Sequence, residues 1–422
     1  MEQRYTFREV PLAEAGEFGR KNGIFQQTKE WANFRNFYKP LAFMAFEGEK
    51  AVLSCIVYKL NIFLTPWSVG YITRGFVGDW SNETLVKEFT AYLKDFCRKK
   101  RIIYTILDPW CDEAVEFETP ENSPRAWLES LGYIRSNAEM QPRTNYRLHL
   151  NPENDAATEQ KRLSDRLAVK LRNDISISRD RGVTVHRFRG EQLREGVHVF
   201  YNLLVETTQK KGFGHRSEDY YYRFAKELED YVTIYLWKYD YDKDMVYTHN
   251  VLNEAEGRLQ TIRDEMANPE TTPQKVERLK PKEREAIKQI DALKRRIELS
   301  EKYKDNPYIS ASFFIKLGDK AYNFYGANAF ALRDLKLTAN YWDMICDAAD
   351  GEVTTFNMGG TLKLTTEKLK EDPMYDLYLY KKQYAGEFVE MPGEYHLVLD
   401  QKKYNFFHKK LNYFRRVVFR AK

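Results

Sequence analysis

Two lysines follow directly on an aromatic stretch near the end of the chain, in Tyr378-Leu379-Tyr380-Lys381-Lys382. The alternation predicts a strand, on which Tyr380 and Lys381 point to opposite faces, so the ring can pack while the ammonium reaches a cleft. An ammonium in a cleft screened from water can stabilise negative charge that develops during a reaction. Tyr380 and Lys381 are therefore candidate residues of a functional site.

A second candidate lies in the segment from Arg216 to Phe224, which we expect to be helical. Arg216 and Tyr220 would then lie one turn apart on the same face, a cation beside a phenol. Such a pair could hold a phosphate together with a base or sugar. The alternative is an exposed helix start whose tyrosines cover the core.

Glycines stand at the ends of two predicted strands, in Arg74-Gly75 and in Tyr325-Gly326-Ala327-Asn328. Glycine at a strand end lets a ligand or another backbone come close, although a bulge or a turn requires it equally often. These segments are candidate parts of a binding site.

Common catalytic signatures are missing from the sequence. There is no GxSxG, HExxH or GxxxxGK[ST] motif, and no GxGxxG between a predicted strand and helix. The seven histidines are scattered without the spacing of metal ligands. The sequence therefore predicts no metal site and indicates no cofactor.

With 43% hydrophobic and 31% charged residues, the chain is typical of a globular protein, and its net charge of +5 does not by itself indicate a polyanionic partner. Basic residues cluster at 98–101, 161–181 and 402–422, either as solvated helix faces or as binding surfaces. Four cysteines without CxxC pairing favour reduced thiols in a cytoplasmic protein. The polar N-terminus lacks a secretion signal and no segment is long enough to span a bilayer, so we expect any membrane contact to be peripheral.

The elements that must position these residues recur in the same order in both halves of the chain. The first half has four predicted strands, at 41–46, 51–60, 69–77 and 102–107, and a helix separates the last two. The second half also has four predicted strands, at 231–238, 309–317, 321–325 and 353–358, and helix 335–349 separates the last two. This recurrence predicts two similar mixed α/β (α+β) domains.

A long insertion at 247–304 interrupts the second repeat. Apolar residues spaced three and four apart predict two helices with facing seams, made by Leu252, Ala255, Leu259, Ile262 and Met266 and by Leu279, Ala286, Ile290, Leu293 and Ile297. The segment 268–273 has the composition of a tight reversal, and Pro281 is expected to kink or delay the second helix. We expect an antiparallel coiled-coil arm standing in water; the alternative is an amphipathic pair packed on the body.

Taken together, the motifs resemble those of the Fem family of peptidoglycan interpeptide-bridge aminoacyltransferases over nearly the whole chain. The matching segments are 27–31 (QTKEW), 74–79 (RGFVGD), 170–173 (KLRN), 216–224, 325–328 (YGAN), 341–345 (YWDMI), 358–360 (MGG), 380–382 (YKK) and 392–394 (PGE). The chain departs from the family at Phe76, where proline is common, and at 357–360, where an aromatic-Gly pair is common. The resemblance implies two tandem GCN5-related N-acyltransferase (GNAT) domains, at 1–150 and at 151–400 with the arm 247–304 inserted, and a basic aromatic C-terminal helix, 401–422, that returns to the first domain.

The resemblance also implies an activity. Family members with the arm transfer glycine, alanine or serine from aminoacyl-tRNA to the stem-peptide amine of a peptidoglycan precursor, either lipid II or UDP-linked muramyl pentapeptide. By similarity, the aromatic-lysine pair Tyr380 and Lys381 is tied to catalysis. By the same similarity, the diphosphate and uridine of a soluble precursor are bound by Arg35, Arg216, Tyr220 and Tyr325.

Two further readings of the sequence stay open. The chain could be an acyl-CoA-dependent N-acyltransferase, although the usual pyrophosphate loop is not evident, or a non-enzymatic tRNA-binding or scaffolding protein. The mixture of cations and aromatics at 402–416 is typical of an interfacial helix, which would bring the protein to the inner face of an anionic membrane. The alternative for this segment is a closing helix on the first domain.

Overall fold

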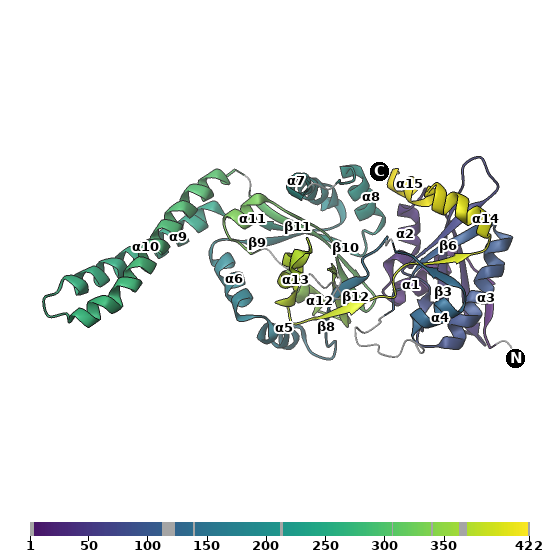
Figure 1. Ribbon diagram of the computed structural model, residues 1–422, viewed down its shortest axis with the longest axis horizontal. Helices are drawn as coiled ribbons and strands as arrows, with labels where there is room; N and C mark the ends of the chain where they lie inside the picture. The colour runs from purple at the N-terminus through teal and green to yellow at the C-terminus, as the bar shows by residue number, and fades with distance from the viewer. Residues whose placement is uncertain are drawn as a thin grey trace.

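The computed structural model describes residues 4–111, 123–137, 140–211, 214–305, 307–338, 341–362 and 369–420. These residues form two mixed β-sheets side by side, each flanked by helices, with a long helical hairpin projecting from one end (Figure 1). The predicted mixed α/β class is confirmed.

The first sheet has the order β1-β2-β3-β4-β6-β15-β7, with β5 beside β3. Its strands are β1 (Thr6–Glu9), β2 (Lys39–Glu47), β3 (Lys50–Asn61), β4 (Ser68–Thr73), β5 (Val77–Gly78), β6 (Ile102–Asp108), β7 (Tyr133–Arg135) and β15 (Tyr395–Val398). Its helices are α1 (Leu12–Lys21), α2 (Lys29–Phe34), α3 (Glu83–Lys99) and α4 (Pro124–Ser130), with the short turn η1 (Phe25–Gln27) before α2. Among the described strands of this sheet, only β4 and β6 run parallel, and helix α3 lies between them in the chain.

The second sheet has the order β14-β8-β13-β12-β11-β10-β9. Its strands are β8 (Thr144–His149), β9 (Thr184–Phe188), β10 (Val232–Lys238), β11 (Tyr308–Leu317), β12 (Lys320–Asn328), β13 (Thr355–Gly360) and β14 (Glu387–Glu390). Its helices are α5 (Ala156–Arg166), α6 (Val169–Asp180), α7 (Leu193–Lys211), α8 (Glu218–Glu227), α11 (Phe330–Asp334), α12 (Trp342–Ala348) and α13 (Tyr375–Lys382), with η3 (Gly190–Gln192) and η4 (Leu369–Glu371). Here β12 and β13 are the parallel pair, which repeats the arrangement of the first sheet.

Each sheet takes one strand from beyond the predicted domain boundaries. Strand β8 lies before residue 150 but pairs with β13 and β14 in the second sheet. Strand β15 lies before residue 400 but pairs with β6 and β7 in the first. The two halves therefore cross over twice.

Three predicted elements differ from the structure. The strand predicted at 69–77 ends at Thr73, because Arg74 has a φ of 51° and turns the chain before β5. The helix predicted at 335–349 is reduced to α12, since Lys336 also has a positive φ, of 52°, just after α11. The segment around Tyr380 and Lys381, predicted as a strand, is the helix α13.

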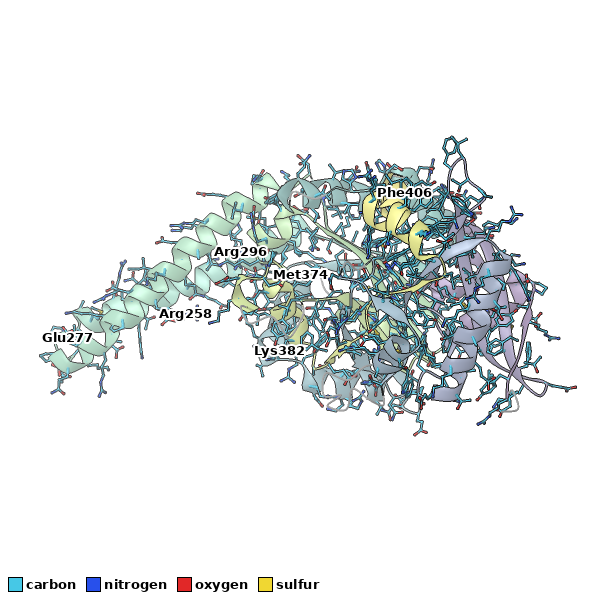
Figure 2. The ribbon with its side chains drawn as sticks, turned by 45° about the vertical axis from the view of Figure 1, so that its right-hand side comes forward. Arg258, Glu277, Arg296, Met374, Lys382 and Phe406 are labelled. Carbon is cyan, nitrogen blue, oxygen red and sulfur yellow. The ribbon has the colours of Figure 1, made fainter. Side chains whose placement is uncertain are left out.

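The projecting hairpin consists of α9 (Tyr241–Ala267) and α10 (Pro273–Lys302), which run antiparallel. The seam residues Leu252, Ala255, Ile290 and Leu293 form a small apolar cluster of their own. Ion pairs cross between the helices, such as Lys294 Nζ to Glu256 Oε1 at 3.2 Å. Arg258 Nη2 also donates across to Gln289 Oε1 at 3.3 Å, and Figure 2 shows Glu277 near the tip of the hairpin. Helix α10 runs through Pro281 from Pro273, so the proline does not delay it.

A buried ion pair fixes the base of the hairpin to the body. Arg181 Nε and Nη2 donate to the Asp244 carboxylate at 2.5 and 2.9 Å, and both side chains are at most 1% exposed. Tyr239 and Ser300 also donate to this carboxylate, at 2.7 and 3.2 Å. Burial alone would raise the pKa of Asp244, but the Arg181 guanidinium outweighs it and lowers that pKa. The Asp244 carboxylate, at the start of α9, is thus held by Arg181, Tyr239 and Ser300, and these contacts fix the base of the hairpin on the body.

The C-terminal segment packs on the first sheet. It comprises α14 (Gln401–Tyr404), the π-helical turn η5 (Asn405–Lys410) and α15 (Tyr413–Arg420). The Tyr404 ring packs edge-on against Tyr104, and the Phe414 ring against Tyr71. Among the described residues, no helix combines the length and hydrophobicity needed to cross a membrane.

Candidate functional site

An aromatic cavity of about 300 Å³ lies between the two sheets. The first sheet and its helices contribute Phe25, Gln26, Trp31, Arg35, Tyr38, Tyr58, Tyr71, Thr73, Arg74 and Trp110. The connection and the second sheet contribute Met140, Gln141, Pro142, Asn145, Tyr220, Tyr322, Asn323, Phe324, Tyr325, Asn357, Gly359 and Gly360. Rings and a few polar groups converging on a concave space are typical of a site for a small organic ligand. We call this space the aromatic cavity.

Three of the predicted binding residues meet in the aromatic cavity. Arg35 lies just after α2, and its guanidinium is 5.8 Å from the Trp31 ring and 5.6 Å from that of Tyr38. The phenol oxygens of Tyr220 and Tyr325 are 3.5 Å apart. Burial by itself lowers the pKa of Arg35, but the surrounding phenols of Tyr38, Tyr220 and Tyr325 reverse the effect and the pKa is raised. A lasting positive charge thus faces aromatic rings and hydroxyls, which suits a negatively charged ligand.

Arg216 lies before the helix that the sequence predicts it to occupy. Ser217 caps α8 by accepting a hydrogen bond from the Tyr220 backbone N–H at 3.3 Å, so Arg216 and Tyr220 are not on one helical face. The Arg216 guanidinium nevertheless lies 5.4 Å from the Tyr220 ring centre. The cation and phenol are therefore neighbours, as predicted, but through a capping turn.

Lys381 is buried directly behind the wall of the aromatic cavity. Its side chain projects from α13, and Nζ donates to the carbonyl oxygens of Gly359 and Gly360 at 2.9 and 2.7 Å. The residue is 2% exposed, and burial lowers the pKa of its amine to about 7. Gly359 has a φ of 83°, a conformation that glycine adopts freely and that turns both carbonyls toward the lysine. A buried amine with a displaced pKa beside a cavity is typical of functional sites.

Tyr380 faces a different space from Lys381. It lines a second cavity of about 500 Å³ together with Trp237, Ser312, Asn328 and Tyr341, and Asn323 lines both cavities. Its hydroxyl is 2.8 Å from that of Tyr384, one helical turn away. Burial raises the pKa of Tyr380 well above its ordinary value. The two side chains diverge as predicted, but the cause is the turn of a helix, since residues i and i+1 lie about 100° apart around its axis.

Asp108, a buried carboxylate beside the aromatic cavity, was missed from the sequence. Asp108, at the end of β6, accepts hydrogen bonds from the Tyr71 hydroxyl at 2.9 Å and the Arg74 backbone N–H at 2.6 Å. Burial raises the pKa of this carboxyl to about 7, although Arg74 opposes the effect. Arg74 in turn lies 5.0 Å from the Trp110 ring and donates to the Pro142 carbonyl at 3.0 Å. The sequence feature that could have indicated Asp108 is an acidic residue at the end of an apolar strand.

Gly75 allows the Gln27 side chain to pack closely against the backbone. A Cβ placed there would come within 2.8 Å of the Gln27 side chain. Gln27 Nε2 donates to the Thr73 carbonyl at 2.8 Å, and its Oε1 accepts from the Ile56 N–H at 2.7 Å. The glycine thus leaves room for this buried amide, which ties β3 to β4.

No three His, Cys, Asp or Glu side chains in the described ranges gather in an arrangement that could hold a metal ion. The polar groups at the aromatic cavity are mostly cations, phenols and amides, and they suit anionic or hydrogen-bonding groups of a ligand.

Comparison with known proteins assigns the family. The chain is 24% identical over 392 residues to the lipid II:glycine glycyltransferase of Staphylococcus aureus strain USA300, covering 91% of this chain and 90% of the relative. The enzyme of the same name from strain Mu50 is 23% identical over the same shares. A solved structure of FemX superposes with a TM-score of 0.69 and 20% identity over 95% of this chain and 99% of that one. The model of the FemAB family matches residues 14–410, and the chain therefore belongs to the FemAB family.

Proposed function

We propose that this protein transfers an amino acid, glycine, alanine or serine, from aminoacyl-tRNA to the stem-peptide amine of a lipid-linked peptidoglycan precursor. Support comes from the family and from relatives named as lipid II:glycine glycyltransferases. The observation that carries the proposal is the buried Lys381 amine behind Gly359 and Gly360, at the wall of the aromatic cavity. In this proposal the enzyme needs no cofactor and works in the cytoplasm at the inner face of the membrane.

The acceptor occupies the aromatic cavity in this proposal. The Arg35 and Arg216 guanidiniums bind phosphate oxygens of the precursor, because a planar guanidinium suits phosphate geometry. The Tyr220 and Tyr325 phenols hydrogen-bond a sugar or base, or stack on it. A soluble UDP-linked muramyl pentapeptide presents the same diphosphate and could occupy the same groups.

The reaction is the attack of the acceptor amine on the ester carbonyl of the aminoacyl-tRNA. A C–N bond forms, the C–O bond to the tRNA ribose breaks, and the amine proton ends on the released hydroxyl or on solvent. Negative charge develops on the carbonyl oxygen, and the Lys381 ammonium stabilises it. Two of the lysine N–H groups already bind glycine carbonyls, and the charged form has a third to offer. Tyr380, on the other face of α13, shapes the second cavity in which the aminoacyl group is held.

The projecting hairpin binds tRNA in this proposal. We infer that its seam packs as an antiparallel coiled coil and that its exposed cations contact tRNA phosphates, which gives affinity without sequence readout. The body then comprises two tandem GNAT-type domains, which follow the predicted bounds 1–150 and 151–400 except that β8 belongs to the second and β15 to the first, with segment 401–422 on the first.

The test compares Lys381→Met with Lys382→Met. Lys382 is the neighbouring lysine on the same helix, but its side chain is exposed (Figure 2). With charged tRNA and lipid-linked precursor, Lys381→Met is expected to lose transfer while tRNA binding persists, and Lys382→Met to transfer normally. Equal transfer by both variants would remove the catalytic assignment. If the wild type transfers nothing but binds tRNA, the chain returns to the class of tRNA-binding proteins.

A further inference from the structure

The turn between β3 and β4 carries an unusual pair of exposed apolar residues. The Phe63 and Leu64 side chains are 76% and 88% exposed, more than any other large hydrophobic residue in the part of the chain that the structure describes. Two adjacent apolar side chains of this size on a protruding turn leave a substantial apolar surface in water. A binding partner that covers them would remove that cost.

The structure holds this turn in shape. The Tyr413 hydroxyl from α15 accepts a hydrogen bond from the Phe63 backbone N–H at 2.9 Å and donates to the Asn61 carbonyl at 3.3 Å. The Ile62 N–H donates across the turn to the Trp67 carbonyl at 2.9 Å. Leu64 has a φ of 58°, which is costly for a residue with a branched side chain. The turn is therefore built to present these side chains outward.

The C-terminal segment lies against the same turn. Phe406 on η5 is 46% exposed, while its neighbour Phe407 turns inward and packs edge-on against Trp67 at 6.1 Å. The Lys403 ammonium lies 4.6 Å from the Trp67 ring. Figure 1 shows the C-terminal helices at the end of the body opposite the projecting hairpin, and Figure 2 shows Phe406 on their outer side. The turn and this segment thus form one continuous surface.

The charge around this surface is mainly positive, and Asp400, just before α14, pairs with Lys403. Residues 401–422 contain eight Lys and Arg and no Asp or Glu, and residues 59–68 contain no acidic residue either. The side chains of Lys402, Lys409 and Lys410 are exposed. Apolar side chains that protrude among cations suit the interface of a bilayer with anionic headgroups. Burial of the apolar side chains and attraction of the cations to the headgroups act together there, and each alone gives only weak binding.

We propose that Phe63, Leu64 and Phe406, with the lysines of η5 and α14, form a docking surface for a bilayer that contains anionic phospholipid. This inference deepens the proposed function and rests on it, because a lipid-linked acceptor would lie in such a bilayer. The inner side of the same segment supports this, because Phe414 packs on Tyr71 at 5.6 Å and Tyr38 at 6.3 Å, two residues that line the aromatic cavity. Docking would therefore bring the cavity close to the membrane.

The test is co-sedimentation of the full chain with vesicles of phosphatidylcholine, with or without phosphatidylglycerol. Wild type is expected to bind the anionic vesicles, and Phe63→Ser/Leu64→Ser to bind them at least about tenfold more weakly, since both side chains are lost from the interface. Lys409→Gln/Lys410→Gln should weaken binding and reduce its salt dependence. The control is Val246→Ser, whose 64% exposed side chain lies at the opposite end on α9, and which should bind as wild type.

Two results would overturn the docking surface: equal binding of the Phe63→Ser/Leu64→Ser variant and wild type, or equal binding of wild type to neutral and anionic vesicles. A second arm separates this inference from the transfer reaction. The same double variant should modify a soluble precursor normally but lose transfer to precursor embedded in vesicles. If wild type modifies neither acceptor, the proposed function fails while the vesicle measurement still decides the docking surface.

Discussion

Replacing Lys381 with methionine separates what this lysine does to stability from what it does in the reaction. Burial lowers the pKa of the amine from 10.5 to about 7. Each pKa unit corresponds to about 1.36 kcal/mol, so keeping this amine buried near neutral pH costs the folded state roughly 4 kcal/mol. Methionine has similar length and removes that cost.

The methionine variant also loses two hydrogen bonds. The Gly359 and Gly360 carbonyls would no longer have the Nζ donor, and an unsatisfied buried carbonyl costs about 1–3 kcal/mol. The two effects are of similar size and opposite sign. Near pH 7 we therefore expect Lys381→Met to fold with a stability within a few kcal/mol of wild type.

The pH dependence of stability shows the buried amine directly. Above about pH 10 the lysine is neutral in both states; as pH falls toward 7, the unfolded chain takes up a proton that the folded chain resists. Wild type should therefore lose roughly 2–3 kcal/mol of stability relative to Lys381→Met between pH 9 and pH 7, with little further change below. Urea unfolding followed by tryptophan fluorescence at both pH values measures the difference.

Activity should respond far more than stability. Removing one group that stabilises an oxyanion typically lowers kcat by about 10²–10³-fold. Transfer by Lys381→Met that stays within a few-fold of the Lys382→Met control would refute the role in the reaction. A stability difference that is constant between pH 7 and pH 9 would refute the buried amine itself.

Three other predictions concern the binding groups, the hairpin and the pH profile. Arg216→Ala or Tyr220→Phe should raise KM for the soluble precursor, roughly tenfold to a hundredfold for the arginine and less for the phenol, in steady-state kinetics with little change in kcat; unchanged KM would remove both from the acceptor site. Asp244→Ala should lower the free energy of unfolding by about 3–5 kcal/mol, because Arg181 is left buried without its carboxylate, and a change under about 1 kcal/mol in urea titrations would contradict this. Because the Lys381 ammonium fades above pH 7 as the acceptor amine becomes neutral, kcat should rise with pH to about 7 and then level off, whereas a continued rise to pH 9 would argue against the charged form.

Local patterns predicted much of the fold. Apolar runs separated by turns at Gly48 and Gly318 gave the hairpins β2-β3 and β11-β12 within a few residues. The spacing of Leu252, Ala255, Ile290 and Leu293 predicted two helices and the sides on which they meet. Such features depend on neighbouring residues, which a single sequence displays.

Long-range pairing was not predictable in the same way. Strands β8 and β15 are short, and nothing within them indicates that each joins the sheet of the other half. The four-residue alternation around Tyr380 fits both a strand and one helical turn, and tertiary packing decides for the helix. The partners of Lys381 and Asp108 come from segments more than twenty residues away, so burial and pKa followed only from the structure.

The most direct test of the account is to incubate the protein with lipid-linked precursor and tRNA charged with glycine, alanine or serine, and to weigh the product by mass spectrometry. The account predicts that the precursor gains the mass of one of these residues, that uncharged tRNA gives no gain, and that acyl-CoA does not replace the charged tRNA. A precursor whose mass stays unchanged with all three charged tRNAs would contradict it.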